Sequence, residues 1–374
     1  STLVDYFFLG KYRVLLTANQ EGYVVALIQA AGTIVNMVVS IFLIYIGAGV
    51  LFVKAVATGV YMLRLVLVKI YAKRKYPALD FHAEPNEGAL KQKNAALLHQ
   101  VVGIIVNNTD TTVLTICLGA KSLLEVSVYG IYMMVVNAVN QLMTSFSNGL
   151  TAGFGEVIAK NEEETLKKSY SSYEYMYFVI MFIVIACMGV LILPFVGVYT
   201  INLTDVQYVR PVLGILFTVI VFMQNVRIPG LTIICAAGHY KETRYQAILE
   251  AVINITVSLG LVWKFGMAGV LLGTVCSYGY RSFEIVFYTS RHLVKGCAKK
   301  SMFRIFRNVL VVALLCIVGT YVIPKNMASF ITWFLYAIGM VAVSVFTIVG
   351  VNYVVEPDEF KELVLRVKGI LRTK

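Results

Sequence analysis

Charged residues are scarce in this sequence. Only 14% of the 374 residues are Asp, Glu, Lys or Arg, whereas 59% are hydrophobic. An average soluble domain has roughly 25% charged residues, because polar side chains must cover its surface. The shortage excludes a soluble protein and indicates that hydrocarbon surrounds much of the chain.

The motifs of catalysis and of cofactor binding are missing as well. His82, His99, His239 and His292 are scattered, and the stretch 119–122 lacks the preceding glycine of a nucleotide-binding loop. The sequence contains no G-x-S-x-G and no H-E-x-x-H pattern. We therefore expect no enzyme activity, no cofactor and no metal site.

Paired cysteines are absent too. The six cysteines form no C-x-x-C motif and lie mostly within apolar runs, so we interpret them as small packing residues. The net charge of +12 comes mainly from residues between apolar runs, and no basic stretch is interleaved with stacking aromatic residues. This pattern predicts contact with anionic membrane lipids and no binding of nucleic acid.

What the sequence has in abundance is long apolar segments. A membrane-spanning helix needs about 20 mostly apolar residues. The expected fold is an all-α polytopic membrane protein with about ten transmembrane helices in this chain. The predicted spans are 23–46, 50–71, 97–118, 123–147, 176–199, 209–234, 246–264, 267–290, 306–324 and 328–351.

The start of the chain does not resemble a natural one. Ser1 is not an initiator methionine, and no signal peptide precedes the first apolar run. The segment 3–16 is too short and too basic at its end to span a membrane alone. We expect it to be the end of a helix whose beginning is absent.

Lysine and arginine alternate strongly between the two sets of connections. One set holds two or more basic residues in every connection, and the other set holds only Lys121, Arg210, Lys264 and Lys325. Cytoplasmic connections are enriched in basic residues. The basic set and both chain ends are therefore predicted to be cytoplasmic in a multi-pass cell-membrane protein.

Two further cytoplasmic helices are predicted. Asn161 precedes three glutamates, so we expect it to be the N-cap of a short helix around 160–175. After Pro357, apolar residues recur at helical spacing, which predicts an amphipathic tail over 352–374 on the inner leaflet. A tail helix packed against the protein is the alternative.

Five basic residues fall inside predicted spans. A charge at the centre of a membrane helix costs roughly 2.5 to 3.5 kcal/mol, so it needs a partner or a wet cavity. Lys69 lies near a cytoplasmic end, where its side chain can extend to the headgroups, and the same interpretation is open for Arg281. The five are Lys54, Arg64, Lys69, Arg227 and Arg281.

Some of these residues share helix faces with polar neighbours. Lys54, Tyr61 and Arg64 fall within about 80° of one another at 100° per residue. Gln224 and Arg227 are three residues apart, just before a proline and a glycine that interrupt a helix. We predict that these five residues bind the substrate.

Acidic and amide side chains form a second polar set. Asp110 follows Asn107 in the span 97–118, and an intramembrane carboxylate can pair with a cation or carry a proton. We therefore predict Asp110 and Asn107 as ion-coupling or pairing residues. Interhelical hydrogen bonds account for most of the other members. These are Gln29, Asn36, Glu125, Asn137, Asn140, Gln141, Glu250, Asn254 and Glu284.

Several stretches, in their order and spacing, resemble a known family. The chain is similar to Wzx-like oligosaccharide flippases, polysaccharide biosynthesis proteins of the multidrug/oligosaccharidyl-lipid/polysaccharide (MATE-like) superfamily. The stretches are FFLGKYRVLLTANQEGYVVALIQAAGTIVN (7–36), NNTDTTVLTICLG (107–119), SNGLTAGFGEVIAKNEEE (147–164), GHYKETRYQAILEAVINITVSLGL (238–261) and FGMAGVLLGT (265–274).

The resemblance implies a MATE-like two-lobe bundle in which spans one to three and most of span four are absent. It implies the following division: 1–72 is the remainder of the N-terminal lobe, 73–96 a cytoplasmic connection, 97–290 the C-terminal lobe with spans seven to twelve, 291–351 two extra spans and 352–374 the tail.

The resemblance also implies a substrate, an undecaprenyl-pyrophosphate-linked oligosaccharide. It implies a cationic cavity in which Arg64, Arg227 and Lys54 bind the pyrophosphate and the sugars. Polysaccharide polymerase and glycosyltransferases are the expected partners. The alternatives are a multidrug cation exporter, a lipid-linked peptidoglycan-precursor flippase and, from another class, a membrane-bound glycosyltransferase or polymerase.

Overall fold

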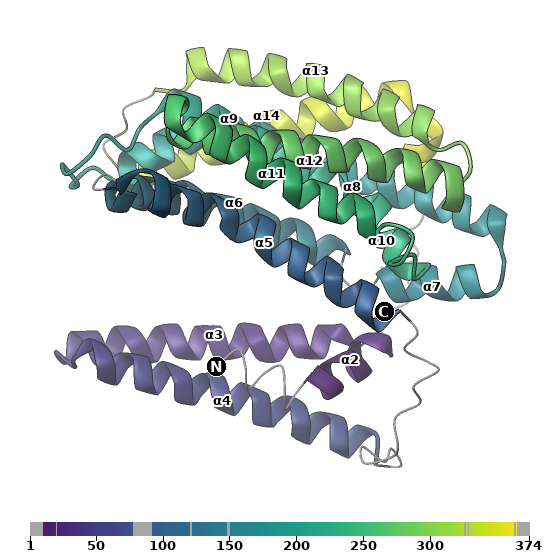
Figure 1. Cartoon of the computed structure of the whole chain (residues 1–374), viewed down its shortest axis with the longest axis horizontal. Coiled ribbons are helices and arrows are strands. Elements are labelled where there is room, and N and C mark those ends of the chain that lie inside the picture. The colour runs from purple at the N-terminus through teal and green to yellow at the C-terminus, as the bar shows by residue number, and fades with distance from the viewer. Residues whose placement is uncertain are drawn as a thin grey trace. The chain divides into compact units, whose positions relative to one another are not determined.

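The chain folds into long helices. The computed structural model describes residues 10–19, 21–77, 92–119, 122–147, 150–324, 327, 329–362 and 364, and its regular elements within these ranges are all helical (Figure 1). The contacts divide the chain into two units, each considered by itself. Unit 1 comprises 1–90 and 148–153, and unit 2 comprises 91–147 and 154–374.

Unit 1 contains α2 (Gly10–Ala18), α3 (Gly22–Tyr45) and α4 (Val50–Lys75), and α7 (Leu150–Ala159) has residues in both units. The elements of unit 2 are α5 (Lys93–Cys117), α6 (Ser122–Ser147), α8 (Glu163–Tyr199), α9 (Pro211–Val226), α10 (Ile228–Ala236), α11 (Arg244–Phe265), α12 (Met267–Tyr288), the π-helix η4 (Thr289–Leu293), α13 (Ala298–Val322) and α14 (Phe330–Val355).

Within the described ranges, eight helical segments are long and apolar enough to cross a membrane. The prediction of an all-α polytopic membrane protein is confirmed. The other two of the ten predicted spans are α5 and α12, which are long enough to cross a membrane but not apolar enough over that length. They carry Asp110, Arg281 and Glu284, which lower the mean hydropathy of these two helices.

In unit 1, α3 and α4 pair lengthwise and α2 lies against both at one end (Figure 1). Tyr12 and Leu16 of α2 pack on Val25, Val68 and Ala72, which form the small apolar core of this unit. The pairing fixes which faces of α3 and α4 meet. It therefore sets the position of the predicted substrate-binding residues of α4.

In unit 2, α11 and α12 pack closely against each other and α5 packs on α11. The turn between α11 and α12 is Gly266, whose φ of +57° favours glycine. A Cβ atom on Gly269 would overlap the Leu261 carbonyl group, and one on Gly273 would overlap Ser258. These glycines bring the polar faces of α11 and α12 within hydrogen-bonding distance.

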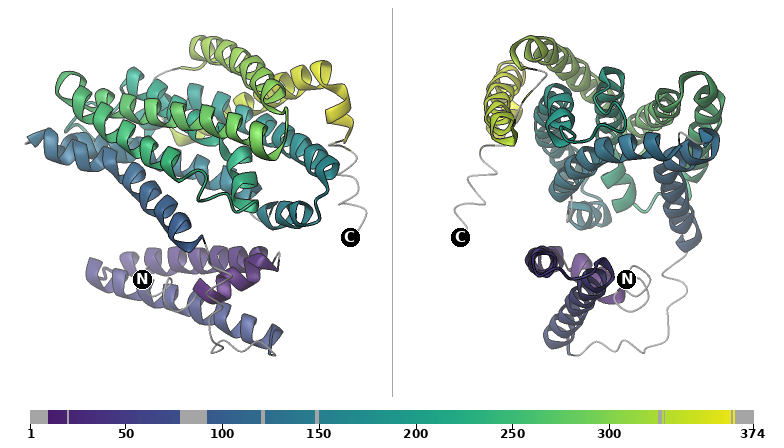
Figure 2. Two further views of the ribbon diagram at one scale, coloured as in Figure 1. Left: turned by 45° about the vertical axis from the view of Figure 1, so that its right-hand side comes forward. Right: turned by 90° about the vertical axis from the view of Figure 1, so that its left-hand side faces the viewer.

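Helix α8 forms a second centre of unit 2. Both α13 and α14 pack against it, as Figure 2 shows from two further directions. Apolar side chains on the outer faces of these helices are widely exposed, and Phe346 of α14 is 84% exposed. Such surfaces fit hydrocarbon rather than water.

The turn before α8 differs from the prediction. Asn161 has a φ of +55°, in the left-handed region that asparagine tolerates, and an N-cap needs extended backbone instead. The N-cap is Glu162, without a side-chain hydrogen bond. The short helix predicted around 160–175 is the beginning of α8, which continues to Tyr199.

Candidate functional site

The predicted helix interruption lies at Arg227. Helix α9 ends at Val226 and α10 begins at Ile228, because Pro229 has no N–H to continue the helical bonding. A Cβ atom on Gly230 would lie 2.6 Å from the Ile285 side chain of α12. The interruption thus occurs beside a close contact between α10 and α12, and Arg227 there contacts residues of α11 and α12.

Arg227 belongs to a group of four ionic side chains, two of them buried and two half-buried, which we name the ionic quartet: Arg227, Glu250, Arg281 and Glu284. Arg227 Nη1 lies 2.5 Å from Glu250 Oε1, and Arg281 Nε lies 3.6 Å from Glu250 Oε2. Arg281 also pairs with Glu284. Arg281 is only 2% exposed, so it is paired inside the bundle and does not extend to the headgroups. The quartet carries no net charge.

An aromatic ring links the quartet to a predicted residue of α5. The guanidinium of Arg227 lies 4.6 Å from the centre of the Tyr278 ring, a cation–π contact. The Tyr278 hydroxyl donates a hydrogen bond to Asn107 Oδ1 at 3.3 Å. The structure therefore brings Arg227 and Asn107, which the sequence assigned to different roles, into one network.

Asp110 lies in a neighbouring group of neutral polar side chains. Thr274 donates a hydrogen bond to Asp110 Oδ1 at 2.7 Å, and Tyr129 donates to Oδ2 at 3.3 Å. Asn254 donates to both Thr274 and Ser277, and its own Oδ1 is buried without a partner. No ion pair forms at Asp110 within the described part of the chain. The carboxylate oxygens of Asp110 and the Oδ1 atom of Asn254 therefore suit a proton or a small cation.

Gln224 points to a different neighbour from Arg227. Asn140 of α6 donates a hydrogen bond to Gln224 Oε1 at 2.9 Å, and Asn225 donates to Asn140 Oδ1 at the same distance. Tyr177 of α8 completes this chain with a hydrogen bond to Asn225. The shared helix face predicted for Gln224 and Arg227 thus serves two separate contacts.

The other predicted substrate-binding residues lie in unit 1. Arg64 of α4 reaches across α3, where its Nη1 donates to the Gln29 carbonyl oxygen at 3.4 Å and to Thr33 Oγ1 at 3.3 Å. Its guanidinium lies 5.1 Å from the Tyr61 ring centre. Lys54 is exposed on the same helix. The face predicted for Tyr61 and Arg64 is therefore a contact face with α3.

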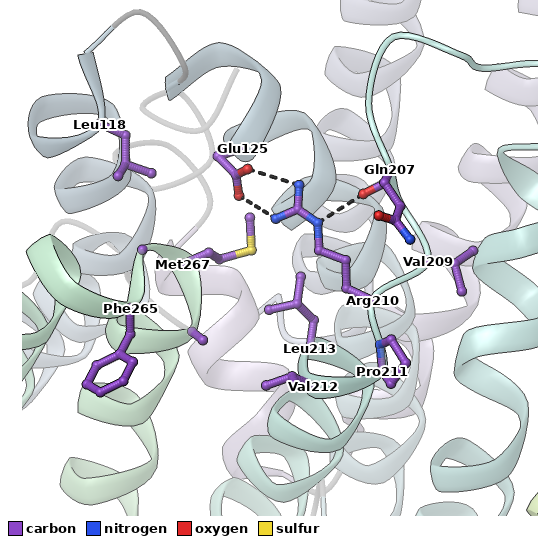
Figure 3. A pocket seen from close by; sticks show the side chains of 12 residues that line it. Leu118, Glu125, Gln207, Val209, Arg210, Pro211, Val212, Leu213, Phe265 and Met267 are labelled. Carbon is purple, nitrogen blue, oxygen red and sulfur yellow. Dashed lines mark hydrogen bonds and ion pairs between the residues drawn. The ribbon is translucent and has the colours of Figure 1, made fainter.

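A cavity of about 540 Å³ lies beside a second ion pair in unit 2 (Figure 3). Arg210 faces Glu125 of α6 with both terminal nitrogens, at 2.8 and 2.9 Å, and its Nε donates to the Gln207 carbonyl oxygen (Figure 3). The sequence assigned Arg210 to a connection and Glu125 to a span. The remaining lining is largely apolar, and includes Leu118, Val212, Leu213, Phe265 and Met267.

A third ionic group is one that the sequence did not predict. Arg304 of α13 is 1% exposed and faces three carboxylates: Glu174 of α8 at 3.0 Å, Glu356 at 3.0 Å and Glu359 at 3.4 Å. The sequence placed Arg304 in a cytoplasmic connection because apolarity begins only after it. The missed signal is the spacing of Arg304 and Asn308, which share a polar face of α13.

The same group holds the first part of the tail. Residues 357–362 are helical, and Glu359 accepts hydrogen bonds from Ser171 of α8 at 2.9 Å and from Lys300. Glu362 accepts a hydrogen bond from Ser172. This part of the tail packs on the protein, which was the alternative to an amphipathic helix on the leaflet. Residue 363 and residues 365–374 lie outside the described residues.

Within the described ranges, no group of three or more His, Cys, Asp or Glu side chains is placed to hold a metal ion. Comparison with protein-family models and with curated proteins gives no match. Unit 2 holds two neighbouring candidate groups, the ionic quartet with Asn107 and Tyr278 and the polar group around Asp110. Unit 1 separately holds the Arg64 contact.

The ionic quartet generates a stability prediction. Glu250→Gln leaves Arg227 without a carboxylate partner and Arg281 with Glu284 alone, and removing one partner of a buried pair costs about 3 to 5 kcal/mol. We expect a marked fall in the melting temperature of the purified protein in detergent. Glu125→Gln, in the more exposed pair with Arg210, is the control and lowers the melting temperature less. Equal losses in the two variants would contradict the buried quartet.

The tail contact generates a pH prediction. Burial raises the pKa of Glu359, but hydrogen bonds from Lys300 and Ser171 and the charge of Arg304 outweigh it and hold this pKa below its usual 4.5. An acid whose pKa is lower in the folded than in the unfolded protein stabilises the fold at every pH above its unfolded-state pKa. This stabilisation is lost as the pH falls through the folded-state pKa.

We therefore expect Glu359→Gln to lower the melting temperature at pH 7, with a difference that shrinks as the pH falls through the lowered pKa of Glu359 in the folded protein. Melting curves of both proteins between pH 3 and pH 7 measure this. A difference that persists unchanged at pH 3 would show that the charge of Glu359 does not hold the tail.

Proposed function

We propose that this protein translocates a lipid-linked (undecaprenyl-pyrophosphate) oligosaccharide repeat unit across a bacterial or archaeal cell membrane for capsule, O-antigen or exopolysaccharide synthesis. One observation carries the proposal. Both predicted arginines, Arg64 and Arg227, hold a buried Nε atom without an acceptor. An unpaired buried donor is unfavourable, so a phosphate oxygen that reached either guanidinium would satisfy it, and arginine matches phosphate in geometry.

The surroundings of these arginines support transport over a purely structural role. Charged side chains inside a membrane protein mark substrate and ion pathways, because hydrocarbon does not solvate them. In the neutral ionic quartet, a pyrophosphate group competes with Glu250 for Arg227. Such competition keeps binding reversible, which a translocation cycle requires. Lys54, about 15 Å along α4 from Arg64, offers a second cationic contact.

The resemblance to Wzx-like flippases supports the same substrate and adds partners. On this proposal the chain forms part of a MATE-like two-lobe bundle, with both ends in the cytoplasm. Glycosyltransferases supply the lipid-linked unit on the cytoplasmic side, and a polysaccharide polymerase consumes it on the other side. Membrane lipids surround the remaining apolar surface.

A second candidate, a multidrug cation exporter of the same superfamily, rests on Asp110. This carboxylate is buried among hydroxyl and amide groups and forms no ion pair within the described residues. A carboxylate that binds a cationic drug would need such a position. Drug resistance and cation uptake in cells that express the protein distinguish this candidate. A lipid-linked peptidoglycan-precursor flippase differs from both in being essential for growth.

Substitutions of the two arginines test the main proposal. In a strain that depends on the intact protein, we expect Arg64→Gln and Arg227→Gln to abolish surface polysaccharide, even after correction for any fall in membrane abundance. Arg227→Lys preserves the ion pair with Glu250 but lacks the Nε donor, so we expect a partial loss, roughly ten- to hundred-fold in export rate. Quantified surface polymer and immunoblots of membranes measure both effects.

Lys69→Gln is the matched control, because Lys69 is exposed near the end of α4 and is not assigned to the site. We expect this variant to export polymer normally. Normal export in both Arg→Gln variants would overturn the substrate-binding assignment. If instead the protein confers drug resistance and only Asp110→Asn abolishes it, the cation exporter is favoured.

A further inference from the structure

The side chain of Arg64 lies across one residue of the neighbouring helix, Gly32 of α3. A Cβ atom added to Gly32 would overlap Cγ and Cδ of Arg64 and lie 2.8 Å from its Nε. The three atoms nearest to that added Cβ all belong to Arg64, and none is backbone of α4. The missing side chain of Gly32 therefore makes room for an arginine, and does not serve a close approach of two helix backbones.

The polar contacts of Arg64 flank this glycine on the same helix face. Gln29, Gly32 and Thr33 have the spacing i, i+3 and i+4, which places them side by side on α3. The Gln29 carbonyl oxygen accepts from Arg64 Nη1 at 3.4 Å and Thr33 Oγ1 accepts at 3.3 Å. Thr33 donates its own proton to the Gln29 carbonyl oxygen at 2.8 Å, so its lone pairs remain for Arg64.

The other side of the guanidinium rests near an aromatic ring. Tyr61 lies one turn before Arg64 on α4, with its ring centre 5.1 Å from the guanidinium carbon. Two hydrogen bonds that Arg64 donates to α3, a ring from α4 and the surface of Gly32 thus hold the group in one orientation. A small cavity lined by Gln29, Tyr61 and Arg64 adjoins it.

We propose that Gly32 is a positioning residue, which fixes the Arg64 guanidinium in the orientation in which it binds the pyrophosphate of the lipid-linked substrate. This inference rests on the proposed function for the identity of the ligand, and on the geometry of unit 1 for the positioning itself. Any side chain at position 32 displaces Arg64 from the hydrogen bonds to Gln29 and Thr33.

Helix stability gives no reason for a glycine at this position. Alanine in a helix interior is favoured over glycine by about 1 kcal/mol. Gly32→Ala therefore stabilises α3 locally and acts against the fold only through Arg64, whose long side chain moves to another rotamer. Gly59 of α4 is the matched control, because no atom lies within 4 Å of an added Cβ there.

A double-substitution cycle in the intact protein tests the positioning without any substrate. We compare the melting temperatures of the parent protein, Gly32→Ala, Arg64→Ala and the combined variant. We expect Gly32→Ala to change the melting temperature less favourably when Arg64 is present than when residue 64 is alanine. Gly59→Ala has the same effect in both backgrounds. Equal effects of Gly32→Ala in the two backgrounds would overturn the inference.

Ligand binding tests the role of the positioned group. The probe is undecaprenyl pyrophosphate in detergent micelles, with undecaprenol as the uncharged comparison, and native mass spectrometry measures the bound fraction. We expect Gly32→Ala to weaken pyrophosphate-lipid binding roughly ten- to hundred-fold and to leave undecaprenol binding unchanged. In the Arg64→Ala background, we expect Gly32→Ala to cause no further loss.

The two measurements separate the inference from the proposed function. If the melting temperatures are coupled but no variant, the parent included, prefers the pyrophosphate lipid, the proposed substrate is wrong and the positioning of Arg64 by Gly32 stands. If the parent prefers the pyrophosphate lipid and Gly32→Ala binds it equally well, the proposed substrate stands and the role of Gly32 in binding is overturned.

Discussion

Hydrocarbon does not solvate charge, and the arrangement of unit 2 depends on this constraint. A charged side chain inside a membrane protein needs an ionic or hydrogen-bonding partner from the protein itself. The buried charges of unit 2 meet this need across helices: Arg227 and Arg281 with Glu250, and Arg304 with carboxylates from three other segments. Apolar helix surfaces pack against many different neighbours with similar energy. Each ion pair therefore helps to select which helices pack together.

The ionic quartet lies where the helix backbone is interrupted and where two helices pack closely. Arg227 at the interruption contacts α11 and α12, and the glycines of α12 let the polar faces of these two helices meet. Unit 1 uses the same physics on a smaller scale, since Gly32 leaves the space that Arg64 occupies. A missing side chain on one helix thus decides where a charge on another helix lies. In this way the packing of small residues and the placement of charge depend on each other.

Part of the site was predictable from local sequence. Arg64, Arg227 and Asp110 stand out because charge inside an apolar run is expensive wherever the partner lies. The partners were not predictable, since Glu250 and Tyr278 are no more conspicuous in the sequence than other polar residues of the spans. Arg304 was assigned to a connection for the opposite reason. Its apolar neighbours begin after it, and only the fold surrounds it with Glu174, Glu356 and Glu359.

The sequence by itself determined that this is an all-α polytopic membrane protein, because composition and the length of apolar runs reflect the solvent around each helix. It also identified Arg64, Arg227 and Asp110 as charges inside apolar runs, and where proline interrupts a helix. Only the tertiary structure decided how these charges are paired. Pairing depends on which helix faces meet, and contacts between segments far apart in the chain leave no periodic pattern in either segment. The contrast between Gln224 and Arg227, which share a helix face and yet contact different helices, shows this limit.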